Sequence, residues 1–148
     1  MIIWIASYPK SGNTWLRTLI ASYYYSKDGV YTKDLINHIG QFPEKRHFKG
    51  FDYDVNSVIG TTDYWIKAQE RINKDKKLRF FKTHNTFGKI NDKSFTNKEN
   101  SLACIYIVRD PRNVITSLAN HYELNYEDSY DWMTNHKKYI YDNTNNKD

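Results

Sequence analysis

A loop with one lysine and one glycine, spanning Tyr8 to Trp15, has the residue types of a phosphate-binding turn. It lies between the apolar run Ile2 to Ala6, typical of a buried parallel strand, and the amphipathic stretch Thr14 to Tyr25. Gly12 would let the backbone approach a ligand, the helix would point unpaired N–H groups at it, and Lys10 would add a charge. Because Lys10 precedes the glycine, the loop does not fit the triphosphate-binding pattern G-x-x-x-x-G-K-S/T. The sequence therefore predicts an anion site of another kind.

Two further polar clusters follow predicted strands. Lys82 and His84 come directly after one strand, and Arg109 comes after another, with Ser117 in the next helix. If these strands are neighbours in a parallel sheet, the clusters converge at the carboxyl ends of the strands, where ligands bind in such sheets. The crevice would then hold a ligand with two separate phosphate-like groups. Taken singly, Lys82 also fits a solvated charge, His84 a loop histidine and Arg109 a surface ion pair.

The motifs resemble, in order, those of the sulfotransferases that use 3′-phosphoadenosine-5′-phosphosulfate (PAPS). Residues 8–15, Y-P-K-S-G-N-T-W, are similar to that family's 5′-phosphosulfate loop, T-Y-P-K-S-G-T-T-W, with Ser7 and Asn13 as departures. Residues 105–117, I-Y-I-V-R-D-P-R-N-V-I-T-S, resemble its 3′-phosphate motif, and residues 82–84 resemble its K-T-H segment. Three motifs in the family's order make a specific match.

The resemblance implies a reaction and a role for each site residue. A sulfuryl group would pass in line from PAPS to the hydroxyl or amine of a small-molecule acceptor, and adenosine 3′,5′-bisphosphate would be released, without a metal. His84 would be the general base, Lys10 would contact the bridging oxygen of the phosphosulfate, and Lys82 would stabilise the sulfuryl oxygens. The implied cofactor-binding residues are Lys10, Ser11, Gly12, Asn13, Thr14, Trp15, Arg109 and Ser117.

The order of predicted elements indicates an α/β fold with a central parallel sheet and helices on both faces. The resemblance makes this a three-layer α/β/α sulfotransferase fold of the P-loop-NTPase-like kind. Family members are usually longer and close the cofactor site with an R-K-G segment that these 148 residues lack. The resemblance therefore implies one partial domain over residues 1–148, either a truncated sulfotransferase or a natural minimal form that completes its site by association. The predicted strands are 2–6, 78–82 and 102–108, and the predicted helices are 14–25, a short one near 33–39, 63–73 with Asp63 as N-cap, one from Pro111 capped by Asp110, and 129–141.

Several apolar side chains have a packing interpretation as well as a functional one. Trp15 would stack on adenine by resemblance, yet it also lies on the helical stripe expected to cover the sheet, formed by Trp15, Leu16, Leu19, Ile20, Tyr23 and Tyr24. The aromatics Phe42, Phe48, Phe51 and Tyr53 could line an acceptor pocket, but packing is the commoner role of such side chains. Cys104 is expected to pack as a small hydrophobe within the third strand.

Composition restricts the class of ligand. The net charge is +5 and the pI about 9.1, which favours an anionic ligand, but acidic residues are interspersed and no basic block suggests nucleic-acid binding. The single cysteine excludes a disulfide framework. No apolar run approaches a membrane span and the start lacks the features of a signal peptide, so a cytoplasmic protein without a membrane partner is expected.

Two alternatives remain at this stage. A noncatalytic nucleotide-binding remnant of a sulfotransferase would keep the phosphate sites without completing the reaction. A small nucleotide kinase would share the strand-loop-helix arrangement, but the G-K-S/T sequence and an acidic Mg²⁺ partner are missing at the first loop. The acceptor and the oligomeric state are left open.

Overall fold

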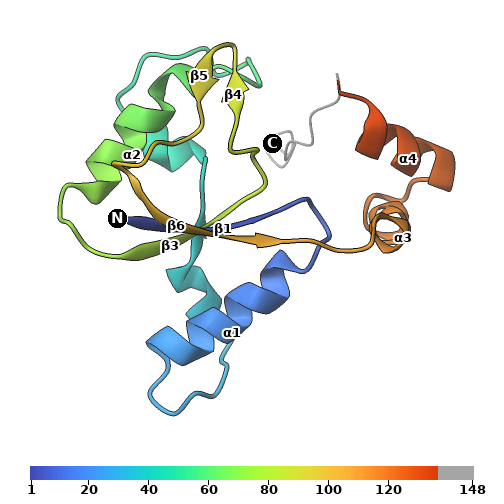
Figure 1. Ribbon diagram of the computed structural model, residues 1–148, viewed down its shortest axis with the longest axis horizontal. Coiled ribbons are helices and arrows are strands. Elements are labelled where there is room, and N and C mark those ends of the chain that lie inside the picture. Colours follow the sequence, from blue (N-terminus) through green and yellow to red (C-terminus); the bar gives the residue numbers. More distant parts are fainter. Residues whose placement is uncertain (137–148) are drawn as a thin grey trace, which may run out of the picture.

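A computed structural model of the chain describes residues 1–136, and its centre is a four-stranded parallel sheet in the order β2-β3-β1-β6 (Figure 1). The three predicted strands are confirmed, and β1 lies between the other two. The short strand β2 and an antiparallel hairpin, β4-β5, were not predicted. The bounds are β1 Ile2–Ser7, β2 Gly40–Gln41, β3 Arg79–Thr83, β4 Lys89–Ile90, β5 Lys93–Ser94 and β6 Ser101–Ile107.

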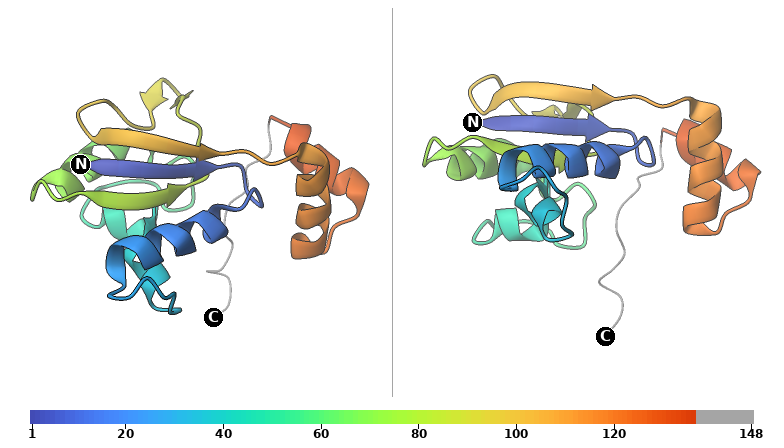
Figure 2. Two further views of the ribbon diagram at one scale, coloured as in Figure 1. Left: turned by 60° about the horizontal axis from the view of Figure 1, so that its bottom comes forward. Right: turned by 90° about the horizontal axis from the view of Figure 1, so that it is seen from below.

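Two helices, α1 and α2, lie on opposite sides of the sheet and make the expected three layers (Figures 1 and 2). The α-helices are α1 Asn13–Tyr25, α2 Trp65–Asn73, α3 Pro111–Tyr122 and α4 Tyr126–Thr134, and the 3₁₀ helices are η1 Leu35–His38, η2 Lys45–Phe48 and η3 Thr62–Tyr64. The predicted cap at Asp63 is wrong, because that residue belongs to η3 and pairs with Lys93 at 3.1 Å.

Side chains of β1 alternate between two apolar cores, as the period of a strand requires. Ile2 and Trp4 pack with Trp65 and Ala68 of α2, whereas Ile5 packs on the other face with Ala21 of α1. Phe42 and Phe48 are fully buried in the first core, and Phe51 and Tyr53 pack against it. The packing interpretation of these four aromatics is therefore confirmed.

Only part of the predicted apolar stripe of α1 faces the sheet. Leu16 and Ile20 pack against the second core, whereas Trp15, Leu19 and Tyr23 are exposed. The exposed residues recur every four positions and form a separate row on the outer side of the helix. The core interpretation of Trp15 is therefore wrong, because the residue is 70% exposed.

Strand β6 is an edge strand with apolar side chains on the surface. Leu102, Tyr106 and Cys104 are exposed, so the predicted burial of Cys104 is wrong. The reason is the position of α3 and α4, which lie beyond the carboxyl end of β6 instead of covering its faces (Figure 2).

Helices α3 and α4 pack on each other. Asp110 caps α3 as predicted, accepting a hydrogen bond from the Arg112 N–H at 2.9 Å. Helix α4 begins earlier than predicted because Asn125 provides its N-cap, and Ser129 is buried within the helix. Residues 137–141 of the predicted helix lie outside the described residues. Within residues 1–136, no helix is long and apolar enough to cross a bilayer.

Candidate active site

The topology brings the three polar clusters to one edge of the sheet. Because β3, β1 and β6 are adjacent and parallel, their carboxyl ends deliver His84, the lysine loop and Arg109 side by side. Two hydrogen bonds join them directly. His84 Nδ1 lies 2.8 Å from the Ser7 carbonyl oxygen, and Arg109 Nη1 donates to the Lys10 carbonyl oxygen at 3.0 Å. The predicted convergence is therefore confirmed for His84, the Lys10 loop and Arg109.

The loop between β1 and α1 has an unusual backbone. Lys10 and Gly12 both adopt positive φ angles, 66° and 102°, and the Ser11 N–H donates to the Tyr8 carbonyl at 3.3 Å. A glycine takes this conformation at little cost, but a lysine in it is strained, as is frequent at functional sites. The loop turns sharply here and leads straight into α1.

The N-terminus of α1 is open to a ligand. Gly12 is its N-cap and no side chain caps the helix. The first N–H groups of a helix lack intrahelical partners, and together with the helix dipole they attract anions. In contrast, Asp110 caps α3 and also binds the Arg112 side chain at 2.6 Å. This interaction lowers the pKa of Asp110 and occupies Arg112, while Arg109 reaches the loop.

His84 is arranged as a proton acceptor. Since its Nδ1 faces the Ser7 carbonyl, Nδ1 carries the hydrogen and the lone pair lies on Nε2. Desolvation lowers the pKa of His84, the charges of Lys82 and Arg17 lower it further, and the hydrogen bond with the Ser7 carbonyl opposes the shift. The imidazole is therefore neutral at neutral pH, as a general base must be.

The side chain of Asn13 points into the protein, away from any ligand at the loop. It is buried and donates from Nδ2 to the Ile5 carbonyl at 2.9 Å and to Ser7 Oγ at 3.1 Å. Asn13 thus ties the first turn of α1 to the end of β1, where the carbonyl that orients His84 lies. Sequence reasoning missed this role of Ser7 and Asn13. The signal was available, since both depart from the family motif in the same loop.

Comparison with known proteins assigns the chain to a family. A family model described as the sulfotransferase domain matches residues 2–147, nearly the whole chain. The chain belongs to the sulfotransferase domain family. No curated protein and no solved structure gave a significant match. The family assignment therefore depends on the domain match, together with the order of the motifs and their convergence in the fold.

The remaining predicted residues occupy varied positions in this sulfotransferase domain. Trp15 and Thr14 are exposed at the start of α1, and Ser11 is buried in the loop. Lys82 is half-buried in β3. Ser117 is half-buried in α3, and within residues 1–136 no hydrogen bond joins it to Arg109 or the loop. The structure thus brings His84, the Lys10 loop and Arg109 together through direct hydrogen bonds.

A small cavity separates the loop of the sulfotransferase domain from its last two helices. Its volume is about 120 Å³, and its lining includes Tyr8, Ser11, Arg109 and Met133. Tyr8 Oη is buried and has no hydrogen-bond partner among the described residues, and burial raises the pKa of this phenol. Among residues 1–136, no cluster of histidine, cysteine or acidic side chains could hold a metal ion.

Proposed function

We propose that this sulfotransferase domain moves a sulfuryl group from PAPS to the hydroxyl or amine of a small-molecule acceptor. The observation that carries the proposal is the hydrogen bond from His84 Nδ1 to the Ser7 carbonyl, beside the uncapped N-terminus of α1. This bond supports the assignment of His84 as a neutral base, beside helix N–H groups that are free to bind an anion. This pairing is what transfer from an anionic donor to a neutral nucleophile requires.

The residues of the loop fit a donor with two anionic ends. The N–H groups that open α1 and the Lys10 ammonium would hold the 5′-phosphosulfate, and the Arg109 guanidinium would hold the 3′-phosphate. Ser117 would add a hydroxyl contact, and Trp15, with its exposed indole, would stack on adenine. Ser11, Gly12, Asn13 and Thr14 would contribute through the loop backbone and, for Thr14, the exposed hydroxyl.

The chain's own groups manage the proton and the charge of the reaction. The donor supplies a sulfuryl group attached to a phosphate leaving group. As the acceptor oxygen or nitrogen forms its bond to sulfur, His84 Nε2 takes the acceptor's proton and the bond between sulfur and the phosphate oxygen breaks. Lys10 would offset the negative charge that develops on that oxygen, and Lys82 would interact with the sulfuryl oxygens.

Transfer of radiolabelled sulfur from PAPS to a panel of hydroxyl and amine acceptors tests the proposal. His84→Ala should lower turnover at least about 100-fold, the usual contribution of a general base, while binding of adenosine 3′,5′-bisphosphate stays unchanged by calorimetry. His121→Ala is the matched control, because His121 is exposed on α3 and should keep full turnover.

The possible outcomes separate the candidate functions. Equal turnover of wild type and His84→Ala would remove His84 from the mechanism. Binding of the bisphosphate by the wild type without transfer to any acceptor would indicate a noncatalytic nucleotide-binding member. Tighter binding of ATP than of the 3′-phosphorylated nucleotide would indicate a kinase.

A further inference from the structure

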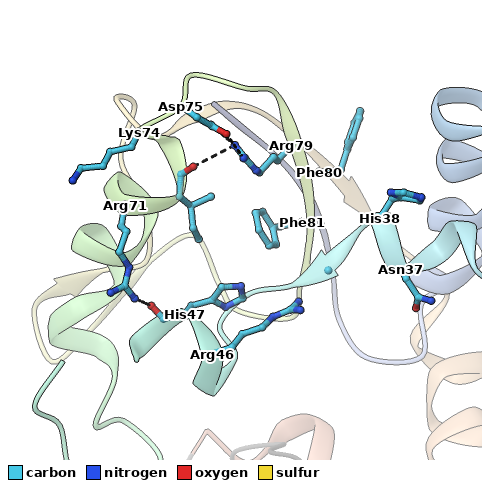
Figure 3. A pocket seen from close by; sticks show the side chains of 12 residues that line it. Asn37, His38, Arg46, His47, Arg71, Lys74, Asp75, Arg79, Phe80 and Phe81 are labelled. Atoms are coloured by element: carbon cyan, nitrogen blue, oxygen red, sulfur yellow. Dashed lines mark hydrogen bonds and ion pairs between the residues drawn. The ribbon is translucent and has the colours of Figure 1, made fainter. Parts of the chain in front are cut away.

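A second cavity, of about 580 Å³, lies where strands β2 and β3 meet the end of α2 (Figure 3). It lies against the first residues of β3, whereas His84 follows the last residue of that strand. The cavity is therefore separate from the candidate active site. Its lining combines an apolar floor, including Phe80, Phe81 and Ile72, with a group of polar and cationic side chains around it.

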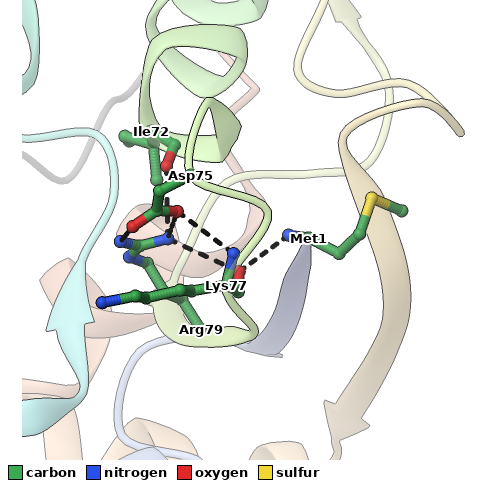
Figure 4. A network of polar contacts seen from close by, with 5 residues as sticks. All are labelled: Met1, Ile72, Asp75, Lys77 and Arg79. Atoms are coloured by element: carbon green, nitrogen blue, oxygen red, sulfur yellow. Dashed lines mark hydrogen bonds and ion pairs between the residues drawn. The ribbon is translucent and has the colours of Figure 1, made fainter.

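Positive charge dominates the lining of this cavity. The cationic side chains are Arg46, Arg71, Lys74 and Arg79, and the only carboxylate in the lining is Asp75. Arg79 already binds Asp75 with two hydrogen bonds, at 2.7 and 2.5 Å, and the Lys77 N–H adds a third at 3.1 Å (Figure 4). These bonds hold the pKa of Asp75 far below its usual range. Arg46 is likewise paired, with Glu44, so Arg71 and Lys74 are the lining cations without a carboxylate partner among the described residues, and they leave the cavity with an excess of positive charge.

Gly40 makes room for one of these cations. A Cβ atom built on Gly40 would lie 2.7 Å from Arg46 Nη2, so the guanidinium lies directly over the glycine at the sheet edge. Glu44 Oε2 holds the opposite side of the group, 2.7 Å from Arg46 Nε. Arg46 is thereby directed across the cavity toward β2, as Figure 3 shows.

Two further side chains can only donate hydrogen bonds to a ligand here. The Glu44 N–H donates to His47 Nδ1 at 3.1 Å, so the neutral ring carries its hydrogen on Nε2. Burial, followed by the charges of Arg46 and Arg71, lowers the pKa of His47 to about 4, so the ring is neutral at pH 7. Arg71 donates to the carbonyls of His47 and Lys49, and within residues 1–136 no carboxylate pairs with its positive charge.

We propose that this cavity binds an oxyanion, namely the sulfate or phosphate group of a small molecule. Donors and positive charge surround the cavity, and its one acidic side chain is already saturated by Arg79. A doubly charged oxyanion would match the excess of arginine and lysine, and guanidinium groups suit it because they present paired donors. The proposal is independent of the proposed transfer reaction, because it uses neither the loop at Lys10 nor His84.

Titration of the full chain with sodium sulfate and with sodium phosphate, at constant ionic strength, tests the site by NMR. Saturable shifts are expected at the amides of Gly40, Arg46 and Arg79. Arg46→Gln should weaken binding about tenfold, the usual effect of losing a charged hydrogen bond. Lys45→Gln is the matched control, since it removes the same charge from the same turn but lies outside the lining, and it should change affinity less than about twofold.

Gly40→Ala provides a test without any change of charge. The added methyl group displaces the flexible end of Arg46, so affinity should fall by a similar factor while the chain stays folded. Tighter binding of sulfate would assign the site to sulfate esters, and tighter binding of phosphate would assign it to phosphate esters. The proposal is overturned if neither ion saturates, if shifts appear only at the Lys10 loop, or if Arg46→Gln and Lys45→Gln weaken binding equally.

Discussion

His84 donates from Nδ1 to the main-chain carbonyl of Ser7, at 2.8 Å, and because a carbonyl can only accept, this bond fixes which nitrogen can accept a proton. Ser7 Oγ lies 3.3 Å from the same Nδ1. Ser7 is the last residue of β1 and is followed directly by the Lys10 loop, so the same short segment of chain positions both the proposed base and the proposed anion site. Because the acceptor is a backbone carbonyl, a change of the Ser7 side chain alone does not remove it. The orientation of His84 depends instead on what holds the end of β1 in place.

The pH dependence of transfer should reveal the electrostatics of His84. Burial and the neighbouring cations lower the pKa of His84, so the neutral base persists to lower pH than an ordinary imidazole. We expect kcat/KM to rise with pH, with a midpoint below the ordinary value of about 6.5, and then to level off. Pre-steady-state measurement of sulfur transfer between pH 4.5 and 8 checks this, and a midpoint above that value would contradict the assigned environment.

Replacing Asn13 should weaken both the fold and the reaction. Asn13→Ala removes two buried hydrogen bonds, to the Ile5 carbonyl and to Ser7 Oγ, and we expect a loss of about 1–3 kcal/mol in the free energy of unfolding, measured with urea. Turnover should also fall, since Ser7 loses the donor that steadies it beside His84. Thr14→Ala, at the exposed neighbouring position, is the control and should stay within about 0.5 kcal/mol of wild type. Equal stability of the two variants would show that the side-chain hydrogen bonds of Asn13 do not stabilise the fold.

Much of the site could be predicted because its parts follow strands whose apolar runs are easy to recognise. Continuous apolar runs identified β1 and β6, and the polar residues that follow these runs in the sequence were therefore expected at the carboxyl ends of the strands. The adjacency of β3, β1 and β6 then follows from the usual packing of such units. The position of Arg109 beside the Lys10 loop is a direct consequence of that topology.

What the sequence could not predict depends on long-range packing. Residue type alone does not show that Asn13 turns inward, because an asparagine can contact either a ligand or the backbone. Cys104 was expected in the core because it belongs to an apolar strand, but whether a strand is covered depends on helices placed by distant contacts. The core interpretation of Trp15 was wrong for a similar reason. Helical periodicity identifies an apolar stripe but does not show which part of the stripe packs against the sheet.

Acid should destabilise the protein partly through His47. Its pKa falls from an ordinary value of about 6.5 to about 4 in the folded protein, so between these values the unfolded state binds more protons. The free energy of unfolding should therefore decrease as pH falls through this window, by up to about 1.4 kcal/mol per pH unit for one proton. Urea unfolding of wild type and His47→Gln checks this. A difference between their stabilities that does not change with pH would contradict the burial of this ring.

The strained backbone at Lys10 should separate stability from activity. Lys10 and Lys76 both have positive φ angles, 66° and 58°, a conformation that costs about 1 kcal/mol or more for a residue with a Cβ atom. Glycine relieves this strain but adds freedom to the unfolded chain, so Lys10→Gly and Lys76→Gly should each change the free energy of unfolding by between 0 and about +1 kcal/mol.

Only Lys10→Gly should lose sulfur transfer, because the ammonium of Lys10 is proposed to act at the leaving group, whereas Lys76 lies in the turn after α2. Urea unfolding and the transfer assay measure the two effects on the same samples. Full transfer by Lys10→Gly, or an equal loss in both variants, would show that the lysine side chain has no specific role in the reaction.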